Sequence, residues 1–342
     1  MEEIKSQNYI EGVNTNNKMI VMLKNGLPSL LIAGLLGITG YYIQIMTGSS
    51  LADPLFIALL LGILTRAVFG QSEILRHGSN LALVLLIPAG TILYGAVNLN
   101  FVKFAALDIR VVFLMIVVVL AYFGVIVALG KWLKQREKTT YLLATGSAIC
   151  GASAIAIMSP AVEAEPDDIS VSLISVFIAG IFGLFILFPF LASLFGVTDK
   201  VYAVLSGTTL QFTGFVKAAV GELPKEISSL AISVKAARYM VLFLAIPLFS
   251  SIIRKKFFIP WFLWAFLAAG LVFSFFPEIS TPLIPIIKPV LDILWATAMA
   301  AIGLNADIKM LLSDNGLKAL LMAFGGFFAA ILVSLLGVSM FF

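Results

Sequence analysis

The feature that most constrains this chain is a series of apolar runs, each long enough to cross the roughly 30 Å hydrocarbon core of a bilayer. The runs are 27–46, 53–70, 80–99, 111–130, 139–160, 168–195, 201–220, 227–250, 258–276, 283–303 and 316–342. Hydrophobic residues make up 61% of the 342 residues, and a soluble domain of this composition would expose much apolar surface to water. The sequence therefore predicts an all-α polytopic membrane protein with about 11 transmembrane helices.

Residues 1–26 differ from the rest because they are polar and lack an apolar core. They are predicted to form a cytoplasmic tail and not a signal peptide, while 27–342 form one integral membrane domain. The chain has one Cys, Cys150, and one His, His77, which disfavours a disulfide, a metal site and a Ser-His triad. The net charge of +4 is too small to indicate nucleic-acid binding. Neither an enzyme nor a cofactor or metal is expected.

Basic residues are distributed unevenly between the loops. If the N-terminus is cytoplasmic and every run crosses, fifteen Lys and Arg lie in inner loops and three in outer loops. This bias follows the positive-inside rule, so a cell-membrane protein with its N-terminus inside and its C-terminus outside is predicted. The acidic loop 163–168 is then outside. A re-entrant course for 201–220 would turn 254–256 outward, which argues against it.

Two segments of the chain resemble each other. Gly146–Ser153, followed by Pro160, is similar to Gly207–Gly214, followed by Pro224, and a long apolar helix comes after each. Such similarity is typical of a transporter with inverted repeats and broken, crossing helices. The alternative is that small residues recur in any membrane protein.

Three groups of residues are candidates for binding a solute. The first group is Gly146, Ser147, Cys150, Gly151 and Ser153. Glycines can break a helix here, and the exposed N-terminus of a half-helix favours an anion. Close helix packing is the alternative for these small residues. The second group is Gly207, Thr208, Thr209 and Gln211, which either bind an oxyanion or form interhelical hydrogen bonds worth about 1 kcal/mol each.

The third group is Lys235 and Arg238, which lie three residues apart and therefore on one helix face. A base near the middle of a span costs about 2.5–3.5 kcal/mol, so it needs a partner or a function. Asp292 is the one clear acid within the runs and is placed to pair with Lys288, which leaves the two bases for a bound anion. The alternative is pairing with backbone carbonyls or a helix C-terminus. Asn98 is interpreted as a cap near a span end.

These segments resemble the motifs of a family of bacterial and archaeal conserved hypothetical membrane proteins described as sulfate exporters. The resemblance covers roughly residues 50–342 and rests on Thr145–Ala156, Ser206–Thr209, Val234–Arg238, Pro260–Phe262 and Ala298–Leu304. It implies the wider group of cation–proton antiporters and anion transporters, with inverted repeats, helices broken at the midplane and an elevator motion. The sequence departs from the family at Gln211, Phe212 and Phe215, where relatives show His, an acid and Gln. The coupling ion of relatives is therefore not implied here.

Together these observations predict a secondary transporter, an exporter, of a small anion such as sulfate or an organic sulfonate or carboxylate. Arg238 and Lys235 would supply charge, and the hydroxyl and amide groups named above would supply hydrogen bonds. A proton or sodium ion is the expected coupling ion, the bilayer is a partner and a homodimer is an option. The alternative is a monovalent cation–proton antiporter, which needs buried carboxylates near the broken helices. Neither 139–160 nor 201–220 contains one.

Overall fold

The computed structural model describes residues 27–49, 51–70 and 81–341, so the tail 1–26 and His77 lie outside the described residues. All regular structure in the described part is helical, as predicted. The helices are Leu27–Thr47, α2 (Pro54–Phe69), η1 (Ala82–Leu86), α4 (Ile87–Asn98), α5 (Phe101–Ala105), α6 (Ile109–Trp132), α7 (Glu137–Ala148), α8 (Ala152–Ala161), α9 (Pro166–Phe182), η2 (Gly183–Leu187), α10 (Phe188–Phe195), α11 (Asp199–Thr209), α12 (Thr213–Ala219), α13 (Lys225–Ala237), η3 (Arg238–Val241), α14 (Leu242–Arg254), α15 (Trp261–Phe275), α16 (Pro277–Gly303), α17 (Ile308–Leu311) and α18 (Asp314–Phe341).

Six helical stretches in the described part are long and apolar enough to cross a membrane. They are Leu27–Thr47, Ile109–Trp132, Pro166–Leu194, Lys225–Arg254, Pro277–Gly303 and Asp314–Phe341, and shorter apolar helices accompany them. Large apolar side chains lie on the outside of these helices, such as Phe113 (56% exposed) and Leu120 (61% exposed) on α6. A surface of this kind suits lipid and not water. The structure thus supports a membrane protein, but eleven separate spans are not confirmed.

The predicted span 139–160 is instead a hairpin, named hairpin 1, made of α7, residues 149–151 and α8. Its two ends meet on one side of the molecule. The Lys138 Nζ at the start of α7 donates to the carbonyl of Glu163, just past α8, at 2.6 Å. Arg136 also reaches the Asp168 carboxylate at 3.2 Å. The segment therefore enters the molecule and returns to the same end, because Gly151 and its neighbours turn the chain in the middle.

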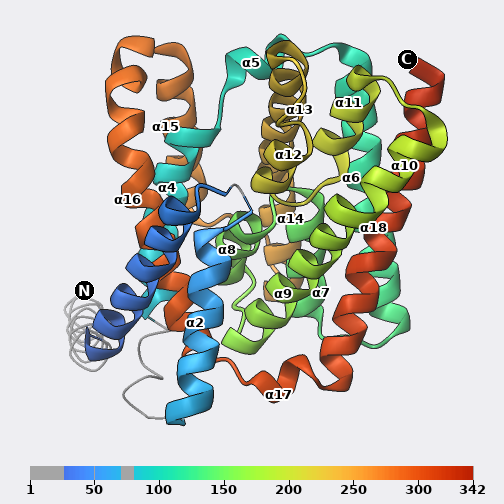
Figure 1. The fold of residues 1–342 in the computed structure, drawn as a ribbon. Coiled ribbons are helices and arrows are strands. Elements are labelled where there is room, and N and C mark those ends of the chain that lie inside the picture. The colour runs from blue at the N-terminus through green and yellow to red at the C-terminus, as the bar shows by residue number, and fades with distance from the viewer. Residues whose placement is uncertain (1–26, 50, 71–80, 342) are drawn as a thin grey trace, which may run out of the picture.

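The predicted span 201–220 is also a hairpin, named hairpin 2, made of α11, residues 210–212 and α12. It enters from the opposite end to hairpin 1, and the tips of the two hairpins meet near the middle of the molecule (Figure 1). A long helical stretch follows each hairpin, α9–α10 after the first and α13–α14 after the second, and these run in opposite directions. This arrangement matches the similarity between the two segments, while duplication of the chain itself stays a prediction.

The acidic loop 163–168 lies at the same end as the basic residues, which corrects its predicted placement. Contacts at this end, called the basic face, join Arg254 to Glu163 at 3.0 Å, Arg136 to Asp168, and Asp167 to the backbone of Asp307 at 2.7 Å. Two hairpins reverse the direction of the chain twice, so α14 still ends at the basic face. The objection to a re-entrant 201–220 therefore disappears. Only the start of α11, with Lys200, moves to the other end, called the C-terminal face, where α18 ends.

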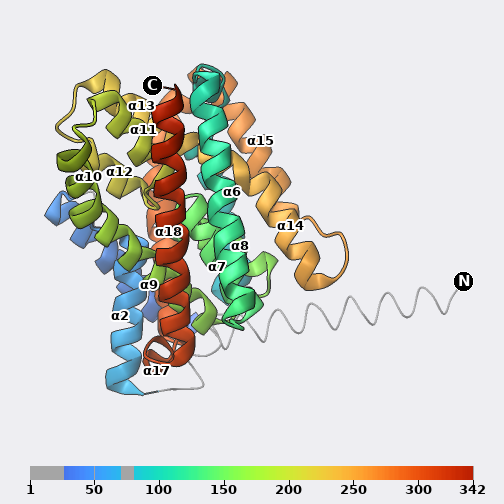
Figure 2. The same cartoon turned by 90° about the vertical axis from the view of Figure 1, so that its right-hand side faces the viewer.

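The helices form two bundles. In the first bundle α16 packs on α2 and α4, and α15 packs on α4. In the second bundle α18 packs on α6 and α9, with α7, α11 and α13 around them. Figure 2 shows α18 and α6 side by side on the outer face of the second bundle, with α14 and α15 to their right. Both hairpins belong to the second bundle, and their tips face the first.

Candidate solute-binding site

The tip of hairpin 1 requires a glycine. Gly151 has φ +68°, a backbone conformation that residues with a side chain rarely adopt. A Cβ at this position would also lie 2.8 Å from the ring of Phe212, which belongs to the tip of hairpin 2. The turn of hairpin 1 and the contact between the two tips therefore both require a residue without a side chain at position 151. Backbone groups that the breaks leave unpaired must find partners inside the protein.

Lys235 joins the two tips. Its buried Nζ donates to the carbonyls of Ile149 at 2.7 Å, Leu210 at 2.7 Å and Gln211 at 2.5 Å. The first carbonyl belongs to hairpin 1 and the other two belong to hairpin 2. A neutral amine has only two N–H groups, so three donated hydrogen bonds require the charged ammonium form.

Arg238 joins the same two hairpins one helical turn later. Its guanidinium donates to the carbonyls of Ser147 and Ala148 in α7, both at 2.8 Å. It also donates to Leu210 at 2.8 Å and Gly207 at 3.3 Å in hairpin 2. The fixed fork of N–H groups on arginine suits this set of four carbonyls.

These contacts correct the expectation that Lys235 and Arg238 coordinate an anion. The alternative from the sequence, pairing with carbonyls at helix C-termini, is what the structure shows. The C-terminus of a helix carries roughly half a negative charge. The ends of α7 and α11 therefore offset about one of the two positive charges. The remainder leaves the hairpin tips electropositive, and both side chains are fully buried.

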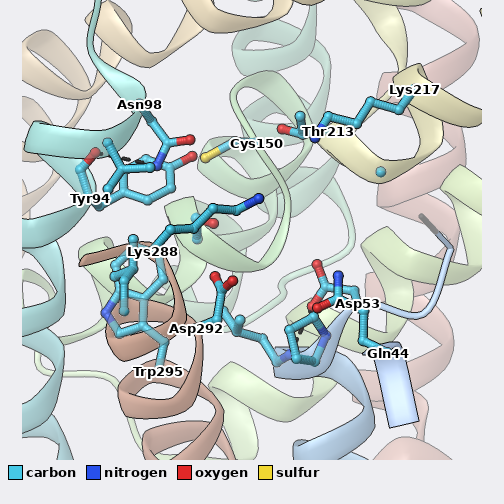
Figure 3. A pocket seen from close by; sticks show the side chains of 16 residues that line it. Gln44, Asp53, Tyr94, Asn98, Cys150, Thr213, Lys217, Lys288, Asp292 and Trp295 are labelled. Carbon is cyan, nitrogen blue, oxygen red and sulfur yellow. Dashed lines mark hydrogen bonds between the residues drawn. The ribbon is translucent and has the colours of Figure 1, made fainter. Parts of the chain in front are cut away.

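A cavity of about 170 Å³ lies between the two bundles, where the hairpin tips face the first bundle (Figure 3). Hairpin 1 contributes Cys150 and Ser153, and hairpin 2 contributes Thr213 and Lys217. Other lining residues come from the first bundle: Gln44, Asp53, Tyr94, Asn98, Lys288, Asp292 and Trp295, with Pro54, Leu55, Val97 and Leu291; Gly214 of hairpin 2 completes the lining. The cavity is thus built by both bundles and both hairpins, and we call it the central cavity.

The charged groups of the central cavity differ in whether other groups of the protein bind them. The Asp53 carboxylate caps α2 by accepting from the backbone N–H groups of Leu55 at 2.9 Å and Phe56 at 3.1 Å. In the described part of the chain, the side chains of Lys217, Lys288 and Asp292 form no hydrogen bond and no ion pair within 4 Å. Two ammonium groups and one carboxylate are therefore available to a solute.

A larger cavity of about 580 Å³, called the funnel, continues from the central cavity toward the C-terminal face. The two cavities share Val97, Asn98, Thr213 and Lys217. The funnel lies between α4–α5 and α12–α13, and its lining includes Lys103, Lys217 and Lys225 but no Asp or Glu. A passage lined by one sign of charge raises the local concentration of ions of the other sign.

Most of the predicted site residues lie outside the central cavity. Gly146 packs on Ile155, and Gly207 packs on the backbone of Ala231. Three of the polar residues point elsewhere: Thr208 bonds the Ser334 hydroxyl at 2.9 Å, Thr209 bonds the carbonyl of its own helix at Leu205, and Gln211 donates to the Tyr122 hydroxyl at 3.4 Å. Ser147 is buried with its Oγ unpartnered in the described structure. Of the eleven predicted residues, Cys150 and Ser153 line the cavity.

The charged residues of the cavity are the ones that sequence reasoning missed as a site. The sequence predicts that Lys288 and Asp292 pair with each other and that Asn98 is a cap. It did not single out Lys217 as a site residue. The available signal was that ionisable residues inside apolar runs are rare and are usually functional. Only the fold brings α12 and α16 to one cavity.

Comparison with known proteins places the chain in a family. The family described as conserved hypothetical protein 698 matches residues 28–323. A UPF0324 membrane protein of Archaeoglobus fulgidus is 29% identical over 304 residues, covering 89% of this chain and 90% of its own length. One of Bacillus cereus is 31% identical over 289 residues (80% of each chain), and one of Streptococcus pyogenes is 27% identical over 318 residues (86% and 91%). No solved structure matches. The chain therefore belongs to the UPF0324 family of membrane proteins.

Proposed function

We propose that this protein is a secondary transporter of a small anion. The observation that carries the proposal is the central cavity. It lies at the tips of two opposed hairpins and offers two lysines, Lys217 and Lys288, whose side chains bind no partner within the described residues. The funnel also supports an anionic solute. Its lining has three lysines and no Asp or Glu, so it would attract anions and repel cations. The electropositive hairpin tips lie directly behind the cavity.

The size of the cavity limits the solute. Its volume of about 170 Å³ is comparable to an engineered cavity of about 150 Å³ that holds one benzene molecule. Sulfate, a short organic sulfonate or a short carboxylate fits such a space, whereas a nucleotide does not. Within the cavity, Lys217 and Lys288 supply charge, and Ser153, Thr213 and Asn98 supply hydrogen bonds. The name sulfate exporter rests only on the family resemblance in the sequence.

Transport would follow from relative motion of the two bundles. The solute contacts Lys217 on the hairpin bundle and Lys288 on the other bundle, so a sliding movement of the hairpins would carry it across the membrane. An elevator motion of this kind is the mechanism that the family resemblance implies. The outward direction, the cytoplasmic N-terminus in the cell membrane and a homodimer belong to the same proposal.

A monovalent cation–proton antiporter is the second candidate, and one observation now favours it. The sequence offered no carboxylate within either hairpin, but Asp53 and Asp292 both line the central cavity beside the hairpin tips. A pair of carboxylates at a broken helix can bind a cation or a proton. The capping role of Asp53 and the two lysines count against this reading.

Thermal stabilisation of the purified protein tests both candidates. A ligand that binds only the folded state raises stability by about 2.7 kcal/mol at a hundredfold excess over Kd. The stability of wild type, Lys217→Gln and Arg110→Gln is measured with sulfate, methanesulfonate, acetate, sodium or potassium. Arg110→Gln is the control, because it removes a charge outside both cavities. The anion transporter is supported if one of the anions stabilises wild type and Arg110→Gln but does not stabilise Lys217→Gln. Stabilisation by sodium or potassium alone would transfer the proposal to the antiporter.

A further inference from the structure

Among the described residues that line the central cavity, Asp292 is the one carboxylate without a hydrogen bond or ion pair. It lies on α16 one turn after Lys288, and Figure 3 shows both side chains directed into the same space. The cavity also receives Lys217 from α12 and the capped Asp53 from the turn before α2. Tyr94 of α4 and Cys150 of hairpin 1 complete the titratable lining, and a phenol and a thiol carry no charge near neutral pH.

We infer that Asp292 binds the proton that is coupled to anion binding, so that the anion and one proton occupy the cavity together. The inference rests on the proposed function. An ionised Asp292 beside Lys217 and Lys288 competes with the solute for the same two ammonium groups. An anion that enters next to this carboxylate is repelled by it, and the repulsion is stronger between two helix bundles than in bulk water because the local dielectric constant is lower. Protonation of the carboxylate removes the competing charge and leaves an O–H group that donates to the anion.

Asp53 cannot take this role without loss elsewhere. Its carboxylate accepts two backbone N–H groups at the start of α2, and hydrogen bonds of this kind favour the ionised form. Asp292 accepts no such bond in the described structure, so its proton can come and go while the fold stays intact. It also lines a second cavity, of about 430 Å³, which lies between Leu27–Thr47 and α16 and shares Gln44 and Lys288 with the central one. Water in that cavity is a source of the proton that does not require passage through the funnel.

The coupling is reciprocal, as linkage requires. A proton that strengthens anion binding is itself held more tightly once the anion is bound. Anion affinity is therefore high below the pH at which the empty cavity loses this proton, and it falls as the pH rises through that range. For one proton, the affinity changes by at most about tenfold per pH unit.

The test measures binding of sulfate and methanesulfonate to the purified protein between pH 5 and 8. Both probes stay fully ionised over this range, so any pH dependence comes from the protein. Wild type is expected to bind more weakly as the pH rises, and addition of sulfate is expected to take up protons from a weakly buffered solution that contains an indicator dye. Asp292→Asn, which is always neutral, should bind tightly at every pH and take up no proton.

Asp53→Asn is the matched control, because it makes the same carboxylate-to-amide change in the same cavity and its amide oxygen can still cap α2. It should keep the pH dependence of wild type. The inference is overturned if Asp292→Asn retains that dependence, or if Asp53→Asn loses it. If wild type binds the anions with no pH dependence, only the coupling fails. If neither wild type nor a variant binds an anion at any pH, the proposed function fails as well.

Discussion

The two hairpins share one design but differ in how they are embedded. In hairpin 1 the returning helix α8 is buried along nearly its whole length and carries no charge. In hairpin 2 the returning helix α12 is shorter, has Lys217 and Ala218 exposed, and lines the funnel. Ion pairs and hydrogen bonds at the basic face hold the ends of hairpin 1. The difference indicates that hairpin 1 is held more firmly at its ends, whereas the returning helix of hairpin 2 is open to the funnel.

The two hairpins nevertheless depend on the same pair of cations. Lys235 and Arg238 bind carbonyls from both tips, so both hairpins share the same support. A polar group buried in the membrane must form its hydrogen bonds within the protein. The carbonyls of the tips therefore explain why α13 and η3 carry two cations, although a charge within the membrane is unfavourable. The predictions below test the shared support first and the differences afterwards.

Arg238→Met should have the largest effect. The substitution removes the donors of four buried carbonyls, and breaking a buried charged network typically costs about 3–5 kcal/mol. Thermal or denaturant unfolding in detergent measures the loss. The control is Arg254→Met, which breaks a partly exposed ion pair with Glu163 and should cost about 1 kcal/mol or less. Equal losses in the two variants would show that the tips are not supported by Arg238.

Gly151→Ala should have the next largest effect, at about 3 kcal/mol. The alanine would occupy a backbone conformation at φ +68° and place its Cβ against the Phe212 ring. Gly196→Ala is the matched control, because Gly196 also has positive φ (+54°) but has open space around it. Its expected cost is about 1–2 kcal/mol. Unfolding in detergent measures both costs. A cost no greater than that of the control would show that the close approach of Gly151 to Phe212 does not contribute to stability.

Labelling of engineered cysteines should distinguish the two returning helices. In a Cys150→Ser background, a membrane-impermeant maleimide applied from the C-terminal face should modify Lys217→Cys through the funnel and should spare Ser159→Cys, which is buried in α8. Fast modification of both positions would contradict the view that only the returning helix of hairpin 2 is open to the funnel.

Lys103→Gln and Lys225→Gln should have the smallest effect. Both residues line the funnel but not the central cavity, so each substitution should slow anion binding about twofold to fivefold at low salt and leave stability unchanged. The difference should fade at high salt because exposed charges are screened. Stopped-flow binding compares them with Arg110→Gln, a charge outside the funnel. A similar slowing in that control would mean that overall charge, and not the funnel, attracts the anion.

Several parts of the fold and site could be predicted from the sequence. The apolar runs predict membrane helices, and the small residues around Gly146 and Gly207 predict breaks in two of them. The chain reversals at these breaks were not predicted, because the loop charges favoured a full crossing for both segments. The spacing of Lys235 and Arg238 correctly predicts that they act together on one face. Their partners could not be predicted, because a carbonyl at the end of a broken helix leaves no trace in residue type. The same limit explains why Thr208, Thr209 and Gln211 were assigned to a site that they do not line.

The sequence by itself determined that this chain is a helical membrane protein of the UPF0324 family, and it determined where its helices break. Tertiary structure alone decided that each broken segment returns to its own side. At hairpin 1, the ion pairs of Arg136 and Arg254 with the acidic loop hold the ends together. It also decided that Lys217, Lys288 and Asp292 share a cavity. Hydrophobicity and helix-breaking residues are local properties of the chain, whereas the partner of a buried charge depends on which segments pack together.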